Sequence, residues 1–178
     1  MREDFQIRQV ADVRRDGPRK LAGLAALYDR EADIGGTRER IARGAFAETL
    51  RGDAEVLAFV DHDAGKLLGR RSVGTLRLSD NDEGLAFEID LPETTLGRDV
   101  LALAERGDLG GMSFGFTVPK GGERRDGNVR VLTAIDLKEI SVVSSWPAYQ
   151  GTHVEARNWH AANKGGGRLP EFLRRWRY

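Results

Sequence analysis

The chain has 178 residues, a length typical of one domain with a substantial hydrophobic core. Lysine plus arginine equals aspartate plus glutamate at 28 each, so the formal net charge is zero, which argues against a protein that coats nucleic acid. The absence of cysteine excludes disulfides, thiolate metal sites and cysteine nucleophiles. The N-terminus has no hydrophobic core of a signal peptide, and no apolar run approaches the length of roughly 20 residues that spans a bilayer. We therefore expect an intracellular protein without a membrane segment.

Short alternating segments separated by glycine-rich turns predict a strand-rich fold. The clearest strands are Val73–Leu78 and Leu85–Leu91, and the second alternates large apolar residues with smaller or charged ones. The polar segment Ser79–Gly84 between them predicts a hairpin loop. A second hairpin loop, exposed and mobile, is expected over Lys120–Asn128. The other predicted strands are Phe5–Val10, Lys20–Tyr28, Val56–Asp61, Met112–Val118, Val129–Ile135 and Lys138–Ser144.

Two helices are expected among these strands. Ala45–Leu50 predicts a short one, and Leu96–Arg106 predicts a longer one with an apolar face. A threonine cap at position 94 or 95 and Gly107 delimit the longer helix. Many short strands with a few helices predict an α+β, strand-rich fold, arranged as a closed or nearly closed β-barrel with the helices packed outside.

The composition changes near the C-terminus. Asn158–Gly167 is polar and glycine-rich, and the residues that follow, up to Tyr178, are basic and aromatic. We therefore expect one domain over residues 1–157 and a linker with a basic-aromatic tail over residues 158–178. A tail of this kind is either a frayed terminus that packs weakly on the domain or a functional element, and both interpretations stay open.

Ser113 is the first candidate for chemistry. It lies in Gly110-Gly111-Met112-Ser113-Phe114-Gly115-Phe116, a hydroxyl between glycines with large apolar neighbours. A nucleophilic serine needs a fixed position, room for substrate and backbone N–H groups aimed at the developing oxyanion. The spacing differs from the G-x-S-x-G elbow of α/β-hydrolases. Considered by itself, a serine in a glycine-rich strand is more often structural than catalytic.

His62 is the second candidate, at the end of a predicted apolar strand and between Asp61 and Asp63. An adjacent acid can orient an imidazole and raise its basicity. One histidine and two neighbouring aspartates on an extended strand cannot all point to one metal ion, so no metal site is expected. A surface histidine at a strand end is the alternative.

Glu139 opens the apolar segment Ile140–Ser144. It is either a solvated residue at the edge of a sheet or an acid that reaches His62 as the third member of a triad. The spacing along the chain does not decide between these interpretations.

An ordered series of motifs over about residues 20–157 resembles the prohead (procapsid) maturation proteases of tailed bacteriophages, a family related to the herpesvirus protease assemblin. Glu39 to Phe46 resembles the family's E-x-I-x-P-G-A-F stretch, with Arg43 where the family usually has proline. The other motifs are Gly23–Tyr28, His62-Asp63, Leu68-Gly69-Arg70, Gly74–Leu78, Gly84-Leu85, Arg106–Leu109, Met112–Phe116, Glu139–Ser144 and Pro147-Ala148-Tyr149.

The resemblance implies a herpesvirus-protease-like barrel and a serine endopeptidase without cofactor or metal. It assigns Ser113 as nucleophile, His62 as general base and Glu139 as third member. Asp61, Asp63 and His153 are the alternative candidates for the third member, and His153 matches no motif of the family. The implied substrates are the scaffolding segment of the major capsid protein, or a separate scaffold, and the protease itself. The implied setting is the assembling procapsid in the host cytoplasm, with self-association into a homodimer or larger assembly and no membrane or specific nucleic acid.

Two other functions remain in view. The same barrel without activity would act as a capsid scaffold or assembly chaperone, and the presence of both His62 and Ser113 in their motifs disfavours it. A nucleic-acid-binding barrel would use the arginines of the tail, and the neutral charge balance counts against it.

Overall fold

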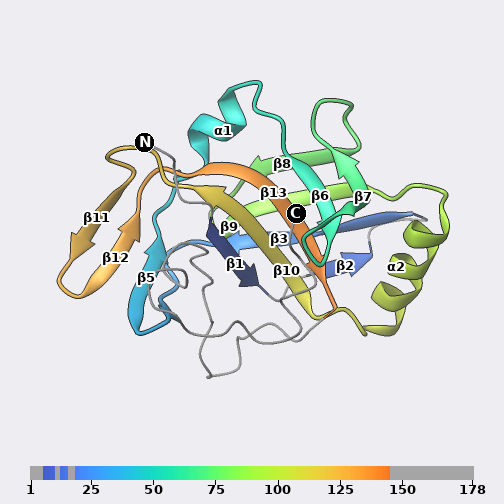
Figure 1. Cartoon of the computed structure of the whole chain (residues 1–178), viewed down its shortest axis with the longest axis horizontal. Helices are drawn as coiled ribbons and strands as arrows, with labels where there is room; N and C mark the ends of the chain where they lie inside the picture. The colour runs from blue at the N-terminus through green and yellow to red at the C-terminus, as the bar shows by residue number, and fades with distance from the viewer. Residues whose placement is uncertain (1–5, 11–12, 16–18, 145–178) are drawn as a thin grey trace, which may run out of the picture.

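The structure is a computed structural model that describes residues 6–10, 13–15 and 19–144 (Figure 1). The described part is a strand-rich α+β fold with thirteen strands and two helices, so the predicted fold class is confirmed. The strands form three sheets, one of five strands and two of four. No closed barrel occurs within these ranges, and the barrel architecture therefore remains a prediction.

The five-stranded sheet carries two of the candidate residues, Ser113 and Glu139. Its order is β1-β10-β13-β6-β7, and all neighbours are antiparallel except β13 and β6, which run parallel. The long strands β10 and β13 cross the middle of the molecule side by side (Figure 1). The strands are β1 (Gln6–Val10), β10 (Gly111–Thr117), β13 (Asp136–Val143), β6 (Leu57–Val60) and β7 (Asp63–Arg70).

Two four-stranded sheets complete the described fold, and the five-stranded sheet is called the central sheet below. One has the order β2-β3-β9-β8 and is antiparallel throughout, with β2 (Val13–Arg15), β3 (Lys20–Leu27), β9 (Gly84–Asp90) and β8 (Leu76–Asp80). The other has the order β11-β12-β5-β4, with a parallel pair at β12 and β5. Its strands are β11 (Glu123–Asp126), β12 (Val129–Leu132), β5 (Thr37–Ile41) and β4 (Ala32–Ile34).

One hydrophobic core joins the sheets and fixes the position of β10. Phe46 packs edge-to-face on Phe114 at 5.9 Å between ring centroids, and Phe114 stacks on Phe116 at 5.4 Å. All three rings are almost completely buried. Each such aromatic pair adds about 0.5–1.5 kcal/mol to the free energy of burial. Strand β10 is therefore anchored in the core by alternate side chains.

Both helices lie outside the sheets and close to their predicted positions. The shorter is α1 (Ala47–Arg51), and the longer is α2 (Thr95–Arg106) at the right of Figure 1. The hydroxyl of Thr94 accepts a hydrogen bond from the backbone N–H of Gly97 at 3.2 Å, which caps α2. Gly107 ends the helix with φ of 74°, a conformation that glycine adopts at little cost.

Several predicted elements differ from the observed ones. Strand β6 ends at Val60, because Asp61 has positive φ and begins a turn, and β8 begins at Leu76 rather than Val73. The expected loop Lys120–Asn128 contains strand β11, which pairs with β12. Strands β2, β4, β5 and β7 were not predicted from the sequence. The predicted start at Phe5 and the tail at 158–178 lie outside the described residues.

A buried ion cluster connects the central sheet to the β11-β12-β5-β4 sheet. Arg8 on β1 binds the carboxylate of Glu39 on β5 through Nε at 2.5 Å and Nη2 at 2.8 Å, and Arg130 on β12 binds it at 2.8 Å. Glu39 is only 4% exposed. The guanidinium of Arg8 also lies 5.1 Å from the ring centroid of Phe116. The carboxylate is thus compensated by two cations, as a buried charge requires.

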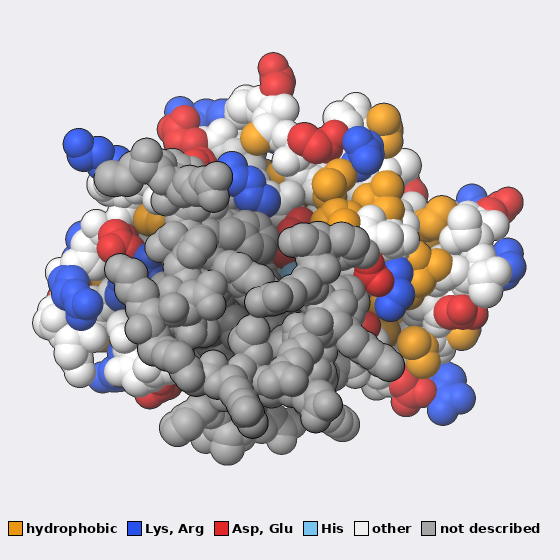
Figure 2. All heavy atoms as spheres, viewed as in Figure 1, with side chains coloured by type: hydrophobic (Ala, Val, Ile, Leu, Met, Phe, Trp, Pro, Cys, Tyr) orange, Lys and Arg blue, Asp and Glu red, His pale blue; other side chains and the backbone are white. Residues whose placement is uncertain are grey.

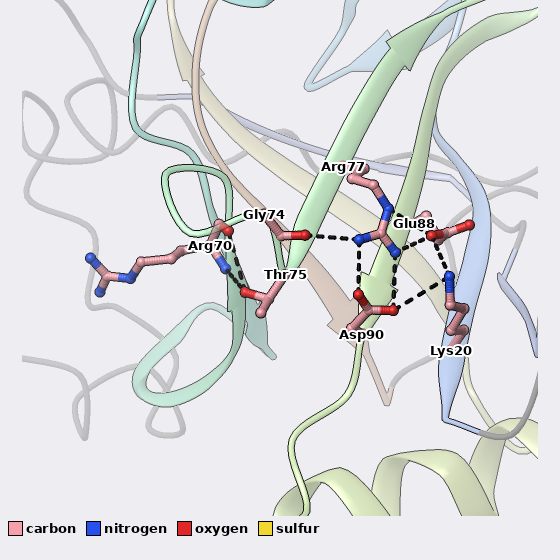
Figure 3. A network of polar contacts seen from close by, with 7 residues as sticks. All are labelled: Lys20, Arg70, Gly74, Thr75, Arg77, Glu88 and Asp90. Atoms are coloured by element: carbon pink, nitrogen blue, oxygen red, sulfur yellow. Dashed lines mark hydrogen bonds and ion pairs between the residues drawn. The ribbon is translucent and has the colours of Figure 1, made fainter.

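A second polar network covers the outer surface of β3, β9 and β8 (Figure 3). Lys20 and Arg77 both bind the Glu88 carboxylate, at 2.8 Å and 2.7 Å, and Arg77 also binds Asp90 at 2.8 Å. The hydrogen bonds from Lys20 and then Arg77 hold the pKa of Glu88 below its usual value, and the bonds from Arg77 do the same for the pKa of Asp90. This network is exposed and lies on a different sheet from the candidate residues.

Hydrophobic side chains gather on one side of the molecular surface. In the view of Figure 2 they lie over β6, β7 and α2, at the right of the face shown. The large hydrophobic residues that are more than a third exposed in the described part of the chain are Leu67, Val73 and Leu103.

Candidate active site

Strand β10 places Ser113 on the face of the central sheet opposite to the aromatic core. Side chains alternate between the two faces of a strand, and Met112, Phe114 and Phe116 all belong to the core cluster. Ser113 and Gly115 therefore point to the other face. Ser113 is completely buried, and its hydroxyl has no hydrogen-bond partner among the described residues. A buried hydroxyl without a partner is unfavourable for stability and is a feature that needs an explanation.

Strand β13 brings two more polar side chains to the same face. In the antiparallel pairing of β10 with β13, Ser113 lies opposite Ser141 and Gly115 lies opposite Glu139. Residues directly opposite each other in an antiparallel pair share a face of the sheet. Ser141 is completely buried and Glu139 is 6% exposed, although both are polar.

The turn between β6 and β7 carries His62 to this face. Val60 pairs with Asp63, so Asp61 and His62 form a two-residue turn, with φ of 51° and 60°. Two consecutive residues with positive φ are typical of the type I′ hairpin turn, and aspartate and histidine tolerate this conformation better than most residues. Because β6 runs parallel to β13, the turn lies beside the end of β13 near Val142.

The turn is attached to β13 and to Ser144, which follows it, through Asp61 and through the backbone of His62. The backbone N–H of Asp61 donates to the carbonyl of Val142 at 2.9 Å. The Asp61 carboxylate accepts from the backbone N–H of Ser144 at 2.8 Å and from the Ser144 hydroxyl at 3.0 Å. The backbone N–H of His62 donates to the hydroxyl of Ser141 at 3.2 Å. These contacts hold an unusual backbone conformation in one position.

His62 and Glu139 are directly joined. Nδ1 of His62 lies 2.7 Å from Oε1 of Glu139, and the hydroxyl of Ser141 donates to Oε2 of Glu139, also at 2.7 Å. A carboxylate only accepts hydrogen bonds, so Nδ1 carries the proton, and in the neutral ring Nε2 keeps a free lone pair. Nε2 is buried and, like the Ser113 hydroxyl, has no hydrogen-bond partner in the described part of the chain.

The candidates thus differ in how closely the structure brings them together. His62 and Glu139 are bonded, and Ser113 lies on the strand next to Glu139 without a hydrogen bond to His62. Asp61 binds Ser144, as described above. Asp63 accepts from the backbone N–H of Gly65 at 2.9 Å and pairs with a lysine. His153, the remaining alternative, lies outside the described residues.

Ser141 also belongs to the site, although its sequence motif did not single it out. The signal for Ser141 was present in the sequence, because Glu139 and Ser141 are two positions apart on a strand and so share a face.

Within the described residues, no group of three or more histidine, cysteine or acidic side chains is arranged to hold a metal ion. A carboxylate bound to one ring nitrogen of a histidine, with a buried serine on the strand next to that carboxylate, is an arrangement that suits acid–base and nucleophilic chemistry.

The comparisons with known proteins agree with this chemistry. A sequence model of the family described as caudovirus prohead serine protease matches residues 4–165. No curated protein and no solved structure matches the chain significantly. In the described part of the chain, neither helix is long and apolar enough to cross a membrane. The family match extends over most of the sequence and includes His62, Ser113 and Glu139. The chain therefore belongs to the caudovirus prohead serine protease family.

Proposed function

We propose that this protein is a serine endopeptidase of procapsid maturation, with Ser113 as nucleophile, His62 as general base and Glu139 as the acid that orients the base. The observation that carries the proposal is the bond of 2.7 Å between Nδ1 of His62 and Glu139, together with the two buried polar atoms that lack partners in the described part of the chain. Those atoms, Nε2 of His62 and Oγ of Ser113, are the two between which a triad transfers its proton.

In the proposed mechanism, Oγ of Ser113 attacks the carbonyl carbon of the scissile peptide bond while Nε2 of His62 takes the hydroxyl proton. The tetrahedral intermediate collapses, the C–N bond breaks, and the proton on Nε2 passes to the leaving amine. Water then attacks the acyl ester, giving its proton to Nε2, and Ser113 leaves with that proton. Backbone amides near Ser113 would stabilise the oxyanion, at about 3–4 kcal/mol per donor. Glu139 stabilises the imidazolium in both halves of the cycle.

The first step requires the serine and the imidazole to approach each other. Catalytic hydrogen bonds are often long or absent before substrate binds and form only in the complex. The burial of both groups favours this approach, because forming the bond would satisfy two polar atoms that otherwise have no partner among the described residues.

The proposed substrates follow from membership of the prohead protease family, whose name places its members in the procapsid. We expect cleavage of the scaffolding segment of the major capsid protein, or of a separate scaffold, inside the procapsid in the host cytoplasm. We also expect self-cleavage, with the linker and tail over residues 158–178 as one region to be removed. We also propose that the strands of this chain are arranged as the closed or nearly closed β-barrel of the herpesvirus protease.

Self-association is also part of the proposal. The exposed hydrophobic side chains over β6, β7 and α2 favour contact with another chain or with the capsid protein (Figure 2). A latent monomer would then become active when it is concentrated inside the procapsid. Specific activity that falls on dilution is the expected result, and activity strictly proportional to enzyme concentration over a wide range would exclude this form of activation.

The alternative, a catalytically silent scaffold or assembly chaperone, has no need for the His62–Glu139 contact. Co-expression with the cognate capsid protein separates the two functions, with the mass of the capsid protein as readout. We expect a shortened capsid protein with the wild type and with Ser79→Ala, a matched control on the exposed strand β8, and full length with Ser113→Ala. Shortening that persists in Ser113→Ala, or that is absent from the wild type, would contradict the proposal.

A further inference from the structure

The hydroxyl of Ser141 is the centre of a closed set of hydrogen bonds. It donates to Oε2 of Glu139 at 2.7 Å and accepts from the backbone N–H of His62 at 3.2 Å. The contact of 2.7 Å between Nδ1 of His62 and Oε1 of Glu139 completes the set. One buried side chain therefore touches both the acid and the backbone of the base, which are 77 positions apart in the sequence.

The direction of each bond follows from the chemistry of the groups. A hydroxyl has one proton to donate and lone pairs to accept, whereas a carboxylate only accepts and a backbone N–H only donates. The proton of Ser141 therefore points at Glu139, and a lone pair of its oxygen points at the N–H of His62. Both roles of the hydroxyl are used in the same site.

The contacts of Ser141 fix the orientation of the Glu139 carboxylate. A glutamate side chain has several rotatable bonds, and its terminal torsion is broad. The bond from Ser141 holds Oε2, so Oε1 is directed at the imidazole. We propose that Ser141 is a positioning residue of this active site: its hydroxyl orients Glu139 toward Nδ1 of His62 and holds the His62 backbone at a fixed distance from that carboxylate. This inference rests on the proposed function of Ser113, His62 and Glu139.

A purely structural role for Ser141 would be to hold the β6–β7 turn, but the turn has independent attachments. Asp61 binds Val142 through its backbone and Ser144 through its carboxylate. Loss of the Ser141 hydroxyl therefore leaves the turn attached to β13. The Glu139 carboxylate and the His62 N–H then each lose one hydrogen bond, and these two groups are the ones through which the loss affects catalysis.

Three substitutions of Ser141 should rank in a specific order. Ser141→Thr keeps the hydroxyl and adds a methyl group, Ser141→Cys keeps the size but replaces the oxygen with a weak hydrogen-bonding sulfur, and Ser141→Ala removes the group. We expect kcat of the threonine variant to stay close to the wild type and kcat of the other two to fall by roughly 10²-fold, the usual effect of a small misplacement of catalytic groups. KM should not change, because the Ser141 hydroxyl is bonded to Glu139 and His62 and makes no hydrogen bond to the Ser113 hydroxyl.

The kinetic test uses the full chain and a peptide that spans the cleavage site mapped by the co-expression experiment. If Ser141 only fills space, the order reverses: the cysteine variant keeps wild-type kcat and the threonine variant, with its extra methyl group, is the worst. That reversed order overturns the inference. The comparison of cysteine with threonine remains decisive even if Ser141→Ala does not fold.

A spectroscopic measurement separates failure of this inference from failure of the proposed function. In the Ser113→Ala background, the Nδ1–H proton of His62 should give a low-field nuclear magnetic resonance signal, assigned by its absence in His62→Asn. We expect Ser141→Cys to shift or broaden this signal and Ser141→Thr to preserve it; an unchanged signal in Ser141→Cys overturns the inference. If wild type and Ser113→Ala cleave equally, the proposed function fails, and this signal alone decides the role of Ser141.

Discussion

Replacing Glu139 by glutamine removes one charge from the site and preserves its shape. The amide can still present an oxygen to Nδ1 of His62, and its NH₂ group can donate to the hydroxyl of Ser141, which has a lone pair free for it. Burial and packing of the strand should therefore change little. What is lost is the attraction between the carboxylate and the imidazolium that forms as Ser113 gives up its proton.

The size of this loss can be estimated from the geometry. Two unit charges separated by the 2.7 Å between Nδ1 and Oε1 attract each other by about 6 kcal/mol at an effective dielectric constant of about 20. The amide keeps a neutral hydrogen bond worth about 1 kcal/mol, which leaves about 5 kcal/mol of lost transition-state stabilisation. At about 1.36 kcal/mol per tenfold change in rate, this corresponds to a decrease in kcat of roughly 10³–10⁴-fold. The neutral isostere of the acid in a serine protease triad costs about 10⁴-fold, which agrees.

The assay is steady-state cleavage of the mapped peptide by Glu139→Gln, with thermal unfolding measured in parallel. Glu88→Gln makes the same chemical change on the exposed outer sheet and should leave kcat unchanged. We expect KM of Glu139→Gln to match the wild type, because both carboxylate oxygens are bonded to side chains of the protein, His62 and Ser141. A decrease in kcat of less than about tenfold in a folded Glu139→Gln variant would refute the assignment of Glu139 to the triad.

Three further predictions concern the fold. Gly97→Ala should lower the free energy of unfolding by roughly 1–3 kcal/mol, although alanine favours helices, because its Cβ would lie 2.0 Å from the carbonyl oxygen of Pro92; a rise in melting temperature would contradict this. Glu39→Ala should cost roughly 1–3 kcal/mol in urea unfolding, since Arg8 and Arg130 lose their shared buried carboxylate while Arg130 keeps its contact with Glu123, and a cost below about 0.5 kcal/mol would show that the cluster is dispensable. Because the pKa of Glu88 is lowered by hydrogen bonds from Lys20 and then Arg77, its contribution to stability is present above the ordinary value of 4.5 and is lost as the pH falls through the lowered pKa. The difference in stability between wild type and Glu88→Gln should therefore be larger at pH 7 than at pH 3, and a difference independent of pH would contradict it.

The elements that the sequence predicted well are those with strong local signals. Helix α2 has an apolar face, a threonine cap and a terminal glycine, all within the one segment 94–107. Strand β9 alternates buried and partly buried positions along most of its length. Both patterns follow from contacts inside one segment, so no knowledge of distant residues is needed.

The missed strands depend on distant partners. Strand β5, Thr-Arg-Glu-Arg-Ile, has three charged residues in succession and is a strand because it pairs with β12 and because Glu39 is neutralised by Arg8 and Arg130. Strand β7 contains two glycines and a lysine, and it forms as the return of the hairpin from β6. Tertiary contacts outweigh local strand propensity at such positions.

In the candidate site, too, some features were predictable from the local sequence and others depend on contacts between distant segments. The residue types of Ser113, His62 and Glu139 and their places in known motifs were readable from the sequence, whereas their proximity depends on the order β10-β13-β6 and on the parallel pairing of β13 with β6. The resemblance already favoured Glu139 over Asp61 and Asp63, whereas the contact between Glu139 and His62 is visible only in the structure. In the turn with positive φ at Asp61 and His62, the His62 ring contacts Glu139 of β13 and the Asp61 carboxylate binds Ser144.

The most direct test of the central claim is to locate the nucleophile by covalent capture. A fluorophosphonate forms an O–P bond with an activated serine and releases fluoride, and trypsin then yields the peptide 107–120, which contains Ser113 as its one serine. We predict an adduct on Ser113 in the wild type, at the concentration where the capsid protein is cleaved, and no adduct in His62→Asn, a substitution that tolerates the positive φ at that position. An adduct on a different residue, or labelling of Ser113 that is equally fast in His62→Asn, would contradict the assignment of Ser113 and His62 as nucleophile and base.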